Sequence, residues 1–78
     1  MNDIAFNQEL DCRGLNCPLP ILKTKKAIDG MSSGDILKMV STDPGSKNDI
    51  SAWANLTGNA LLSSGEHGSD FVYYIQKS

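Results

Sequence analysis

The chain has 78 residues, of which 40% are hydrophobic and 21% are charged, with a formal net charge of −2; this size and composition predict one small globular domain over residues 1–78, with residues 1–5 disordered. The acidic balance argues against strong direct nucleic-acid binding, because domains that bind nucleic acid electrostatically are usually basic. No run approaches the roughly 20 apolar residues of a membrane span, and residues 1–9 lack the basic and apolar segments of a secretion signal. We therefore expect a cytoplasmic protein without a membrane partner. We also expect a monomer.

In chain order, the first half predicts a strand, a helix and a second strand. Residues 6–12 alternate in polarity, with Leu10 and Cys12 on one face, which is typical of a half-buried strand. Residues 18–28 predict an amphipathic helix. Its apolar stripe comprises Ile21, Thr24, Ala27, Ile28 and Met31. A second, well-covered strand is expected over residues 35–42.

The second half predicts another helix and a hairpin. An Asp-Pro-Gly-Ser turn at residues 43–46 leads into a helix over residues 47–57. The apolar face of this helix consists of Ile50, Trp53, Ala54 and Thr57. Two further strands, at 59–64 and 70–77, are joined by the Gly-flanked segment 65–68.

The order βαβαββ predicts an α/β fold: a two-layer sandwich with a four-stranded mixed sheet and two helices on one face. The direction of the strand that follows the second helix stays open at this point.

Two cysteines and one histidine restrict the chemistry. A structural zinc site takes four Cys or His ligands, so no metal is expected. A secreted disulfide scaffold would have more cysteines. No Gly-rich phosphate loop is present, so no cofactor is expected. So small a core is also expected to lack a pocket, which leaves Cys12 and Cys17 as either buried filler or reactive thiols.

The segment Cys17-Pro18-Leu19-Pro20 predicts a reactive thiol. Pro18 disfavours the helical conformation for Cys17 and itself suits the first helical position, which places Cys17 at the N-cap. Pro20 has no backbone N–H, so the N–H of Leu19 is the expected donor to a Cys17 thiolate. The helix dipole at this position lowers a thiol pKa. We therefore assign Cys17 as the catalytic residue, with Pro18, Leu19 and Pro20 supporting it.

Basic residues gather around the same segment. Arg13, Lys23, Lys25 and Lys26 supply four of the seven basic residues, and no acidic residue lies between them in the sequence. Arg13 and Gly14 are expected to support the site. The three lysines, with Arg13, are expected to dock acidic partners, although lysines at these positions are equally consistent with an ordinary solvated helix face.

The other candidate residues are weaker. Cys12 shares the apolar face of Leu10, so buried filler is preferred to a resolving thiol, and its C-x4-C spacing from Cys17 differs from the C-x-x-C of dithiol oxidoreductases. His67, in the predicted hairpin loop, is expected to be solvated rather than catalytic. One exposed, activated sulfur without an acid, a base or a cofactor suits thiol exchange with a sulfane sulfur.

These motifs resemble those of the TusA (SirA-like) sulfur-carrier family. The resemblance covers nearly the whole chain and rests on Leu10-Asp11-x-Arg13-Gly14-Leu15-x-Cys17-Pro18-x-Pro20, Thr42-Asp43-Pro44-Gly45-Ser46, Asp49-Ile50 and Trp53. It implies a sandwich like the C-terminal domain of translation initiation factor three and a persulfide on Cys17. The implied partners are a cysteine desulfurase or rhodanese-type sulfur donor and a TusD/DsrE-type acceptor. The protein itself is then expected to have no independent enzymatic turnover.

Several alternatives stay open. Leu19 stands where tRNA-thiolation members typically carry glutamate, and Cys-Pro-Leu-Pro is similar to carriers from sulfur-oxidising bacteria. The sulfur therefore has three candidate destinations: 2-thiouridine in tRNA, molybdenum cofactor and sulfur oxidation. The alternatives to a sulfur carrier are a two-thiol redox domain, with Cys12 as the resolving thiol, and an interaction domain that uses only the first helix.

Overall fold

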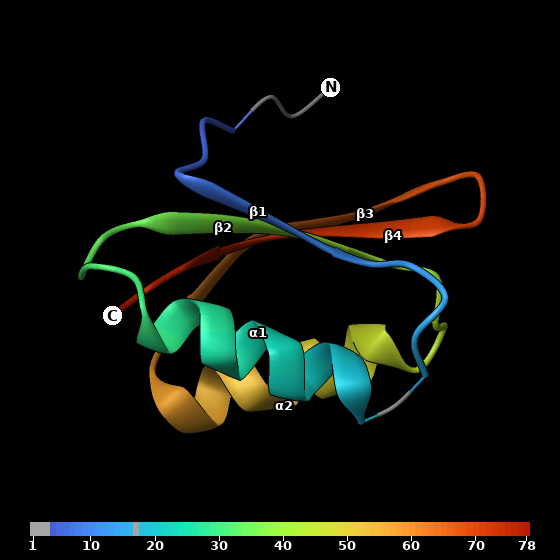
Figure 1. Cartoon of the computed structure of the whole chain (residues 1–78), viewed down its shortest axis with the longest axis horizontal. Helices are drawn as coiled ribbons and strands as arrows, with labels where there is room; N and C mark the ends of the chain where they lie inside the picture. Colours follow the sequence, from blue (N-terminus) through green and yellow to red (C-terminus); the bar gives the residue numbers. More distant parts are fainter. Residues whose placement is uncertain (1–3, 17) are drawn as a thin grey trace.

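The structure is a computed structural model that describes residues 4–16 and 18–78. Its elements are β1 (Gln8–Cys12), α1 (Leu19–Asp29), β2 (Ile36–Ser41), α2 (Ser46–Thr57), β3 (Ala60–His67) and β4 (Asp70–Gln76). Figure 1 shows two layers, with the strands above and both helices below them. The predicted α/β sandwich with the order βαβαββ is confirmed.

The four strands form one mixed sheet in the order β1-β2-β4-β3. β1 and β2 are parallel, whereas β4 is antiparallel to both β2 and β3. β3 therefore runs parallel to β2 at the far edge of the sheet, which answers the question that the sequence left open. Because crossovers between parallel strands share one hand, α1 and α2 cover the same face of the sheet (Figure 1).

The core lies between this face and the two helices. Its buried cluster consists of Cys12, Ile28, Met31, Leu37, Met39, Ile50, Tyr73 and Ile75. Trp53 packs against the cluster, as predicted. One buried hydrogen bond joins the layers: 2.7 Å separates Ser46 Oγ at the start of α2 from the Tyr73 hydroxyl in β4. Thr57 departs from its prediction, since it is exposed and donates its hydroxyl to the Trp53 carbonyl.

The hairpin turn is shorter than predicted. β3 continues through residues 65–67, and a two-residue turn at Gly68 and Ser69 connects it to β4. Gly68 has φ of +62°, and no residue other than glycine has a positive φ among the described residues. This φ pattern is that of a type II′ turn, which takes glycine at its first central position. His67 therefore lies in a strand, and its predicted place in a loop is wrong.

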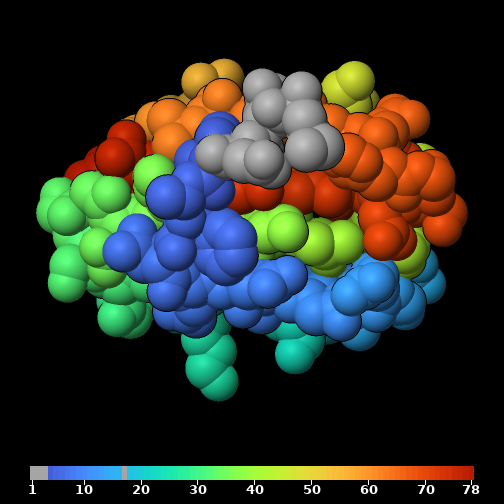
Figure 2. Space-filling view, turned by 90° about the horizontal axis from the view of Figure 1, so that it is seen from above, coloured from blue at the N-terminus to red at the C-terminus, as the bar shows by residue number. Residues whose placement is uncertain are grey.

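The opposite face of the sheet carries no helix. Figure 2 views the molecule from this side, with β2 and β4 exposed between β1 and the far end of the β3–β4 hairpin. The irregular segment before β1 reaches over this face, where the rings of Phe6 and Tyr74 are 6.3 Å apart. Of the residues predicted to be disordered, 1–3 lie outside the described residues, and Ile4 and Ala5 belong to this irregular segment.

Candidate functional site

A tight turn follows β1 and starts the segment that contains the Cys-Pro-Leu-Pro motif. The N–H of Leu15 donates to the Cys12 carbonyl at 3.2 Å, and Gly14 between them has φ of +81°. A type II turn requires a positive φ at its third residue, and Gly14 is the third residue of this turn, which is why glycine is needed there. The Gly14 N–H donates to Thr42 Oγ1 at 2.9 Å, so the turn is tied to the end of β2.

The start of α1 lies one residue later than the sequence predicts. Pro18 is the N-cap residue, with φ of −96° and ψ of 13°, and Leu19 is the first helical residue. Pro18 was predicted at the first helical position, so that prediction is wrong. Cys17, the predicted N-cap and the catalytic candidate, lies outside the described residues.

The backbone N–H of Leu19 is already engaged. It donates to the Asn16 carbonyl at 2.8 Å, so its predicted role as the donor to a Cys17 thiolate is wrong. Pro20 is buried in the interface beneath the helix, and its carbonyl accepts a 2.7 Å hydrogen bond from the buried Thr24 hydroxyl. The first turn of α1 is therefore anchored to the core through Pro20 and Thr24.

The three predicted docking lysines, Lys23, Lys25 and Lys26, are all exposed on α1. Lys25 forms an ion pair with Asp29 at 2.9 Å, one helical turn further along. Across residues 4–16 and 18–78, neither Lys23 nor Lys26 is part of an ion pair. Two of the three exposed lysines, Lys23 and Lys26, are thus without an ion pair among the described residues.

Arg13 is also compensated by neighbouring carboxylates. Its Nε lies 3.0 Å from Asp11 Oδ1, and its Nη1 lies 3.6 Å from Asp70 Oδ2. Hydrogen bonds from the Arg13 backbone N–H and then from its guanidinium hold the pKa of Asp11 below its usual value. Sequence reasoning missed Asp70 because β4 brings it to β1 across more than 50 residues of chain. Arg13 is therefore not the free cation that the sequence suggested.

Cys12 is fully buried among the side chains of the core. Burial raises the pKa of its thiol, which opposes formation of the reactive thiolate. The interpretation of Cys12 as buried filler is confirmed.

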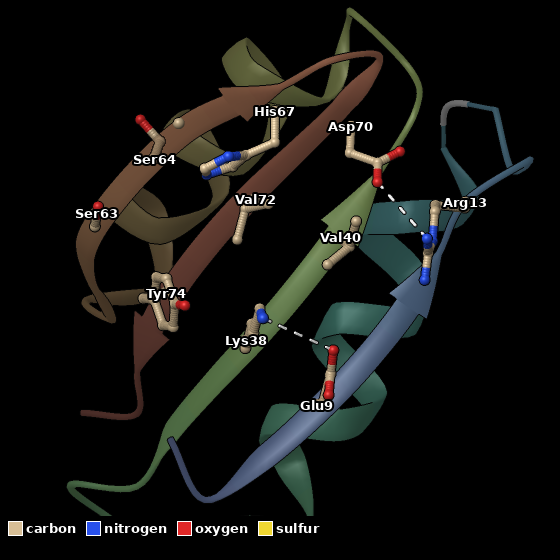
Figure 3. A pocket seen from close by; sticks show the side chains of 11 residues that line it. Glu9, Arg13, Lys38, Val40, Ser63, Ser64, His67, Asp70, Val72 and Tyr74 are labelled. Carbon is tan, nitrogen blue, oxygen red and sulfur yellow. Dashed lines mark ion pairs between the residues drawn. The ribbon is translucent and has the colours of Figure 1, made fainter. Parts of the chain in front are cut away.

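A groove of about 550 Å³ crosses the uncovered face of the sheet, where the sequence predicted no pocket. Its floor includes Val40 and Val72, and its rim includes His67 and the pair Arg13–Asp70 (Figure 3). The groove exists because only one face of the sheet is covered by helices. No cysteine lines it, so among the described residues it offers no thiol chemistry.

Two further results concern the described part of the chain, residues 4–16 and 18–78. It contains no group of three or more His, Cys, Asp or Glu side chains placed to hold a metal ion. Neither of its helices combines the length and the apolar character needed to cross a bilayer.

Comparison with known proteins agrees with these features. Residues 8–77 match the family model described as Sulfurtransferase TusA. The chain is 55% identical over 73 residues to the sulfur carrier protein TusA of Allochromatium vinosum, a match that covers 94% of this chain and 96% of the relative. It is 35% identical over 77 residues to the sulfur carrier protein TusA of Pseudomonas putida, covering 99% and 96%.

One solved structure has the same fold. A SirA-like protein from Desulfitobacterium hafniense superposes with a TM-score of 0.79 at 18% sequence identity. The match covers 90% of this chain and 96% of that chain.

Proposed function

Because the chain belongs to the TusA family, we propose that it is a sulfur carrier, which holds a sulfane sulfur as a persulfide on Cys17 and passes it to an acceptor protein. The observation that carries the proposal is the Cys-Pro-Leu-Pro segment at the start of α1. Of the two cysteines, Cys12 is buried in the core, which leaves Cys17 as the candidate for chemistry with another protein.

The start of α1 supports a thiolate in a way that differs from the sequence prediction. The N-terminal end of a helix favours an anion through its dipole, and Cys17 immediately precedes Pro18, the N-cap residue of α1. Leu19 donates its N–H to Asn16 and Pro20 has no N–H, so the support we assign to the thiolate is the field of the helix end and neither of these two amides. Lys23 adds positive charge one turn further on.

The transfer is a balanced thiol exchange. The Cys17 thiolate attacks the outer, sulfane sulfur of a donor persulfide and forms a new S–S bond with it. The S–S bond of the donor breaks, and the sulfur atom of the donor's own thiol leaves as a thiolate. An acceptor thiolate then attacks the outer sulfur of Cys17 and regenerates the Cys17 thiolate. No net oxidation occurs, so neither a metal nor a redox cofactor takes part.

Partner proteins then supply the sulfur and accept it, while this chain supplies only the cysteine that carries it. The donor is a cysteine desulfurase or a rhodanese-type protein, and the acceptor is of TusD/DsrE type, in 2-thiouridine synthesis, sulfur oxidation or a related route in the cytoplasm. His67 lies on the uncovered face, away from the helices (Figure 3), so it does not serve as a base for independent turnover.

The test is persulfide loading followed by intact-mass measurement. A cysteine desulfurase with L-cysteine should add the mass of one sulfur atom to the wild type and to Cys12→Ala, but not to Cys17→Ser. Cys12→Ala is preferred to a serine variant because serine would bury a hydroxyl at this site. An adduct that persists in Cys17→Ser would refute the assignment, and a Cys12–Cys17 disulfide as the only product would favour the redox alternative.

The rate of alkylation by iodoacetamide gives a second readout. In Cys12→Ala, its dependence on pH should report a thiol pKa below the ordinary value of about 8.5. An ordinary value would remove the argument from the helix terminus.

A further inference from the structure

The uncovered face of the sheet carries three rows of side chains that run across the strands. The lysine row consists of Glu9, Lys38 and Tyr74, the valine row of Val40 and Val72, and the arginine row of Arg13, Asp70 and His67. All of these residues line the groove, and Figure 3 shows the rows in this order. Neighbouring rows are two residues apart along a strand, so about 7 Å separates them.

Each outer row contains one basic and one acidic side chain at a loose distance. In the lysine row, Lys38 Nζ lies 4.0 Å from Glu9 Oε2, and in the arginine row, Arg13 Nη1 lies 3.6 Å from Asp70 Oδ2. Both distances exceed the roughly 2.7–2.9 Å of a charge-assisted hydrogen bond, so these charged groups can take further partners. A third carboxylate, that of Asp11, lies at the edge of the face and is compensated by Arg13 Nε at 3.0 Å.

An aromatic side chain packs on the lysine row. The ring centroid of Phe6 lies 6.3 Å from that of Tyr74 and 5.4 Å from Lys38 Nζ, and Phe6 is 43% exposed. The next residue fixes this position, because the Asn7 N–H donates to the Ile36 carbonyl and the Ile36 N–H donates to Asn7 Oδ1, both at 2.8 Å. An exposed ring is thus held on a polar face, and aromatic side chains are enriched in protein interfaces.

Two copies of this face are complementary when a two-fold axis runs along the valine row. Such an axis turns the second copy over, keeps each strand at its place across the sheet and exchanges the two outer rows, so every contact occurs twice. Glu9 then lies opposite Arg13 of the second copy, and Tyr74 lies opposite Asp70 of the second copy. Both contacts join a donor to an acceptor: guanidinium to carboxylate, and phenol hydroxyl to carboxylate. Phe6 comes over the arginine row of the second copy, where a guanidinium can stack on its ring.

A two-fold axis along the strands fits this face less well. It would set Arg13 opposite His67 of the second copy and Glu9 opposite Ser63 of the second copy. Neither the guanidinium nor the carboxylate would then meet an opposite charge. Charge pairing therefore selects the axis along the valine row.

We propose that the uncovered face is a dimer interface between two copies of this chain, related by the axis along the valine row. The molecule measures 30 × 28 × 18 Å, and Figure 1, which looks down the shortest axis, shows the sheet edge-on with its strands along the longest. The face thus spans about 30 by 18 Å, and two such faces bury roughly 1,000 Å² in total, the lower limit for a specific interface. The dimer is therefore weak and reversible, which differs from the monomer expected from the sequence.

This interface goes beyond the proposed function and does not depend on it. Both helices cover the opposite face of the sheet, so they stay on the outside of the dimer (Figure 1). The dimer therefore carries two starts of α1, one on each outer side.

Analytical ultracentrifugation of the full chain measures the association. The chain is kept in reducing buffer, so that no disulfide forms between two copies, and its concentration runs from about 10 μM to about 1 mM. The weight-average mass should rise from that of a monomer towards that of a dimer over this range. In methyl NMR spectra over the same range, the signals of Val40 and Val72 should shift, whereas those of Ile28 and Ile50, in the core on the helix side, should stay fixed.

Glu9→Lys tests the charge contact. It sets a lysine opposite Arg13 of the second copy at two places, so the dissociation constant should rise about tenfold or more at low salt, and less at high salt. Glu66→Lys is the matched control, because Glu66 is also exposed in an edge strand but pairs with Phe71, whose side chain packs on the helix side. This control should leave the dissociation constant unchanged. Phe6→Ser, which changes no charge, should raise it about tenfold, because each copy loses an aromatic contact.

An exchange of charges between two variants tests the axis itself. Arg13→Glu alone should also fail to dimerise, because it sets two carboxylates opposite each other. An equal mixture of Glu9→Lys and Arg13→Glu should dimerise again, since each of these contacts then joins opposite charges. Circular dichroism checks the fold of each variant, and the comparison of Glu9→Lys with Glu66→Lys decides alone if Arg13→Glu does not fold.

Several results would overturn the proposal. One is a wild-type chain that stays monomeric up to about 1 mM, and another is a dimer that forms only without reducing agent. A dimer that Glu9→Lys and Glu66→Lys weaken equally would refute the charge contact, and so would a mixture of folded variants that stays monomeric. Methyl shifts confined to the helix side would place the interface there instead. Persulfide loading of Cys17 is measured separately, so each of these results leaves the carrier function intact.

Discussion

Replacing Gly14 with alanine tests the turn that begins the Cys-Pro-Leu-Pro segment. Gly14 has φ of +81°, and an added Cβ would meet no atom within 4 Å, so the substitution introduces backbone strain without a steric clash. An L-residue in this left-handed region costs roughly 1–2 kcal/mol. Removal of a glycine from the unfolded chain offsets about 0.4–1 kcal/mol of that cost. We expect a net loss near 1 kcal/mol, which lowers Tm by roughly 4–8 °C for a chain of this size.

Differential scanning calorimetry measures this loss, and Gly65→Ala is the matched control. A Cβ at Gly65 would also meet no atom within 4 Å, but its φ is not positive, so alanine there should leave Tm unchanged or raise it. Gly14→Asn should lose less than Gly14→Ala, because asparagine enters the left-handed region more readily. If Gly14→Ala melts at or above the wild-type temperature while Gly65→Ala behaves as expected, the argument from φ is wrong.

Two further predictions concern the core. Tyr73→Phe leaves the buried Ser46 hydroxyl without the partner that lies 2.7 Å away, so the free energy of unfolding measured in urea should fall by about 1–3 kcal/mol. Adding Ser46→Ala should recover part of this loss. Equal stability of Tyr73→Phe and wild type would contradict the prediction. Burial also raises the pKa of both Cys12 and Tyr73 above their ordinary values of about 8.5 and about 10. The unfolded chain therefore releases these two protons first, so stability should be constant below about pH 9 and fall above it, with a shallower fall in Tyr73→Phe. In a Cys17→Ser background, a flat urea profile up to about pH 11 would show that burial does not set these two pKa values.

The local pattern was sufficient to predict the type and order of all six elements. The alternation before Cys12 and the helical spacing through Ile28 are short-range features, so a single sequence carries them. The errors lie at element ends. The hairpin turn was placed at residues 65–68 because glycines flank that segment, yet pairing with β4 extends β3 to His67. Cross-strand hydrogen bonding outweighed the local signal there.

The electrostatics of the candidate site could not be predicted in the same way. The cluster of basic residues suggested four cations available for docking, but Arg13 meets Asp70 from β4. Lys25 also has a partner, Asp29, although this pair has i,i+4 spacing on one helix and is visible in the sequence. The Arg13–Asp70 partnership depends on strand order, which no local pattern encodes. The engagement of the Leu19 N–H by Asn16 likewise depends on the geometry of one turn.

By itself, the sequence determined the chemistry on offer: two thiols, one next to paired prolines at a helix start, on a small acidic α/β chain. Only the tertiary structure decided which thiols and which charged side chains remain accessible for that chemistry. Packing of the helices on one face of the sheet buried Cys12 and left Leu19, Leu22, Lys23 and Lys26 in solvent. The order of the strands brought Asp70 to Arg13. The physical reason is that residue types are local, whereas burial and charge pairing arise between segments that the strand order brings together.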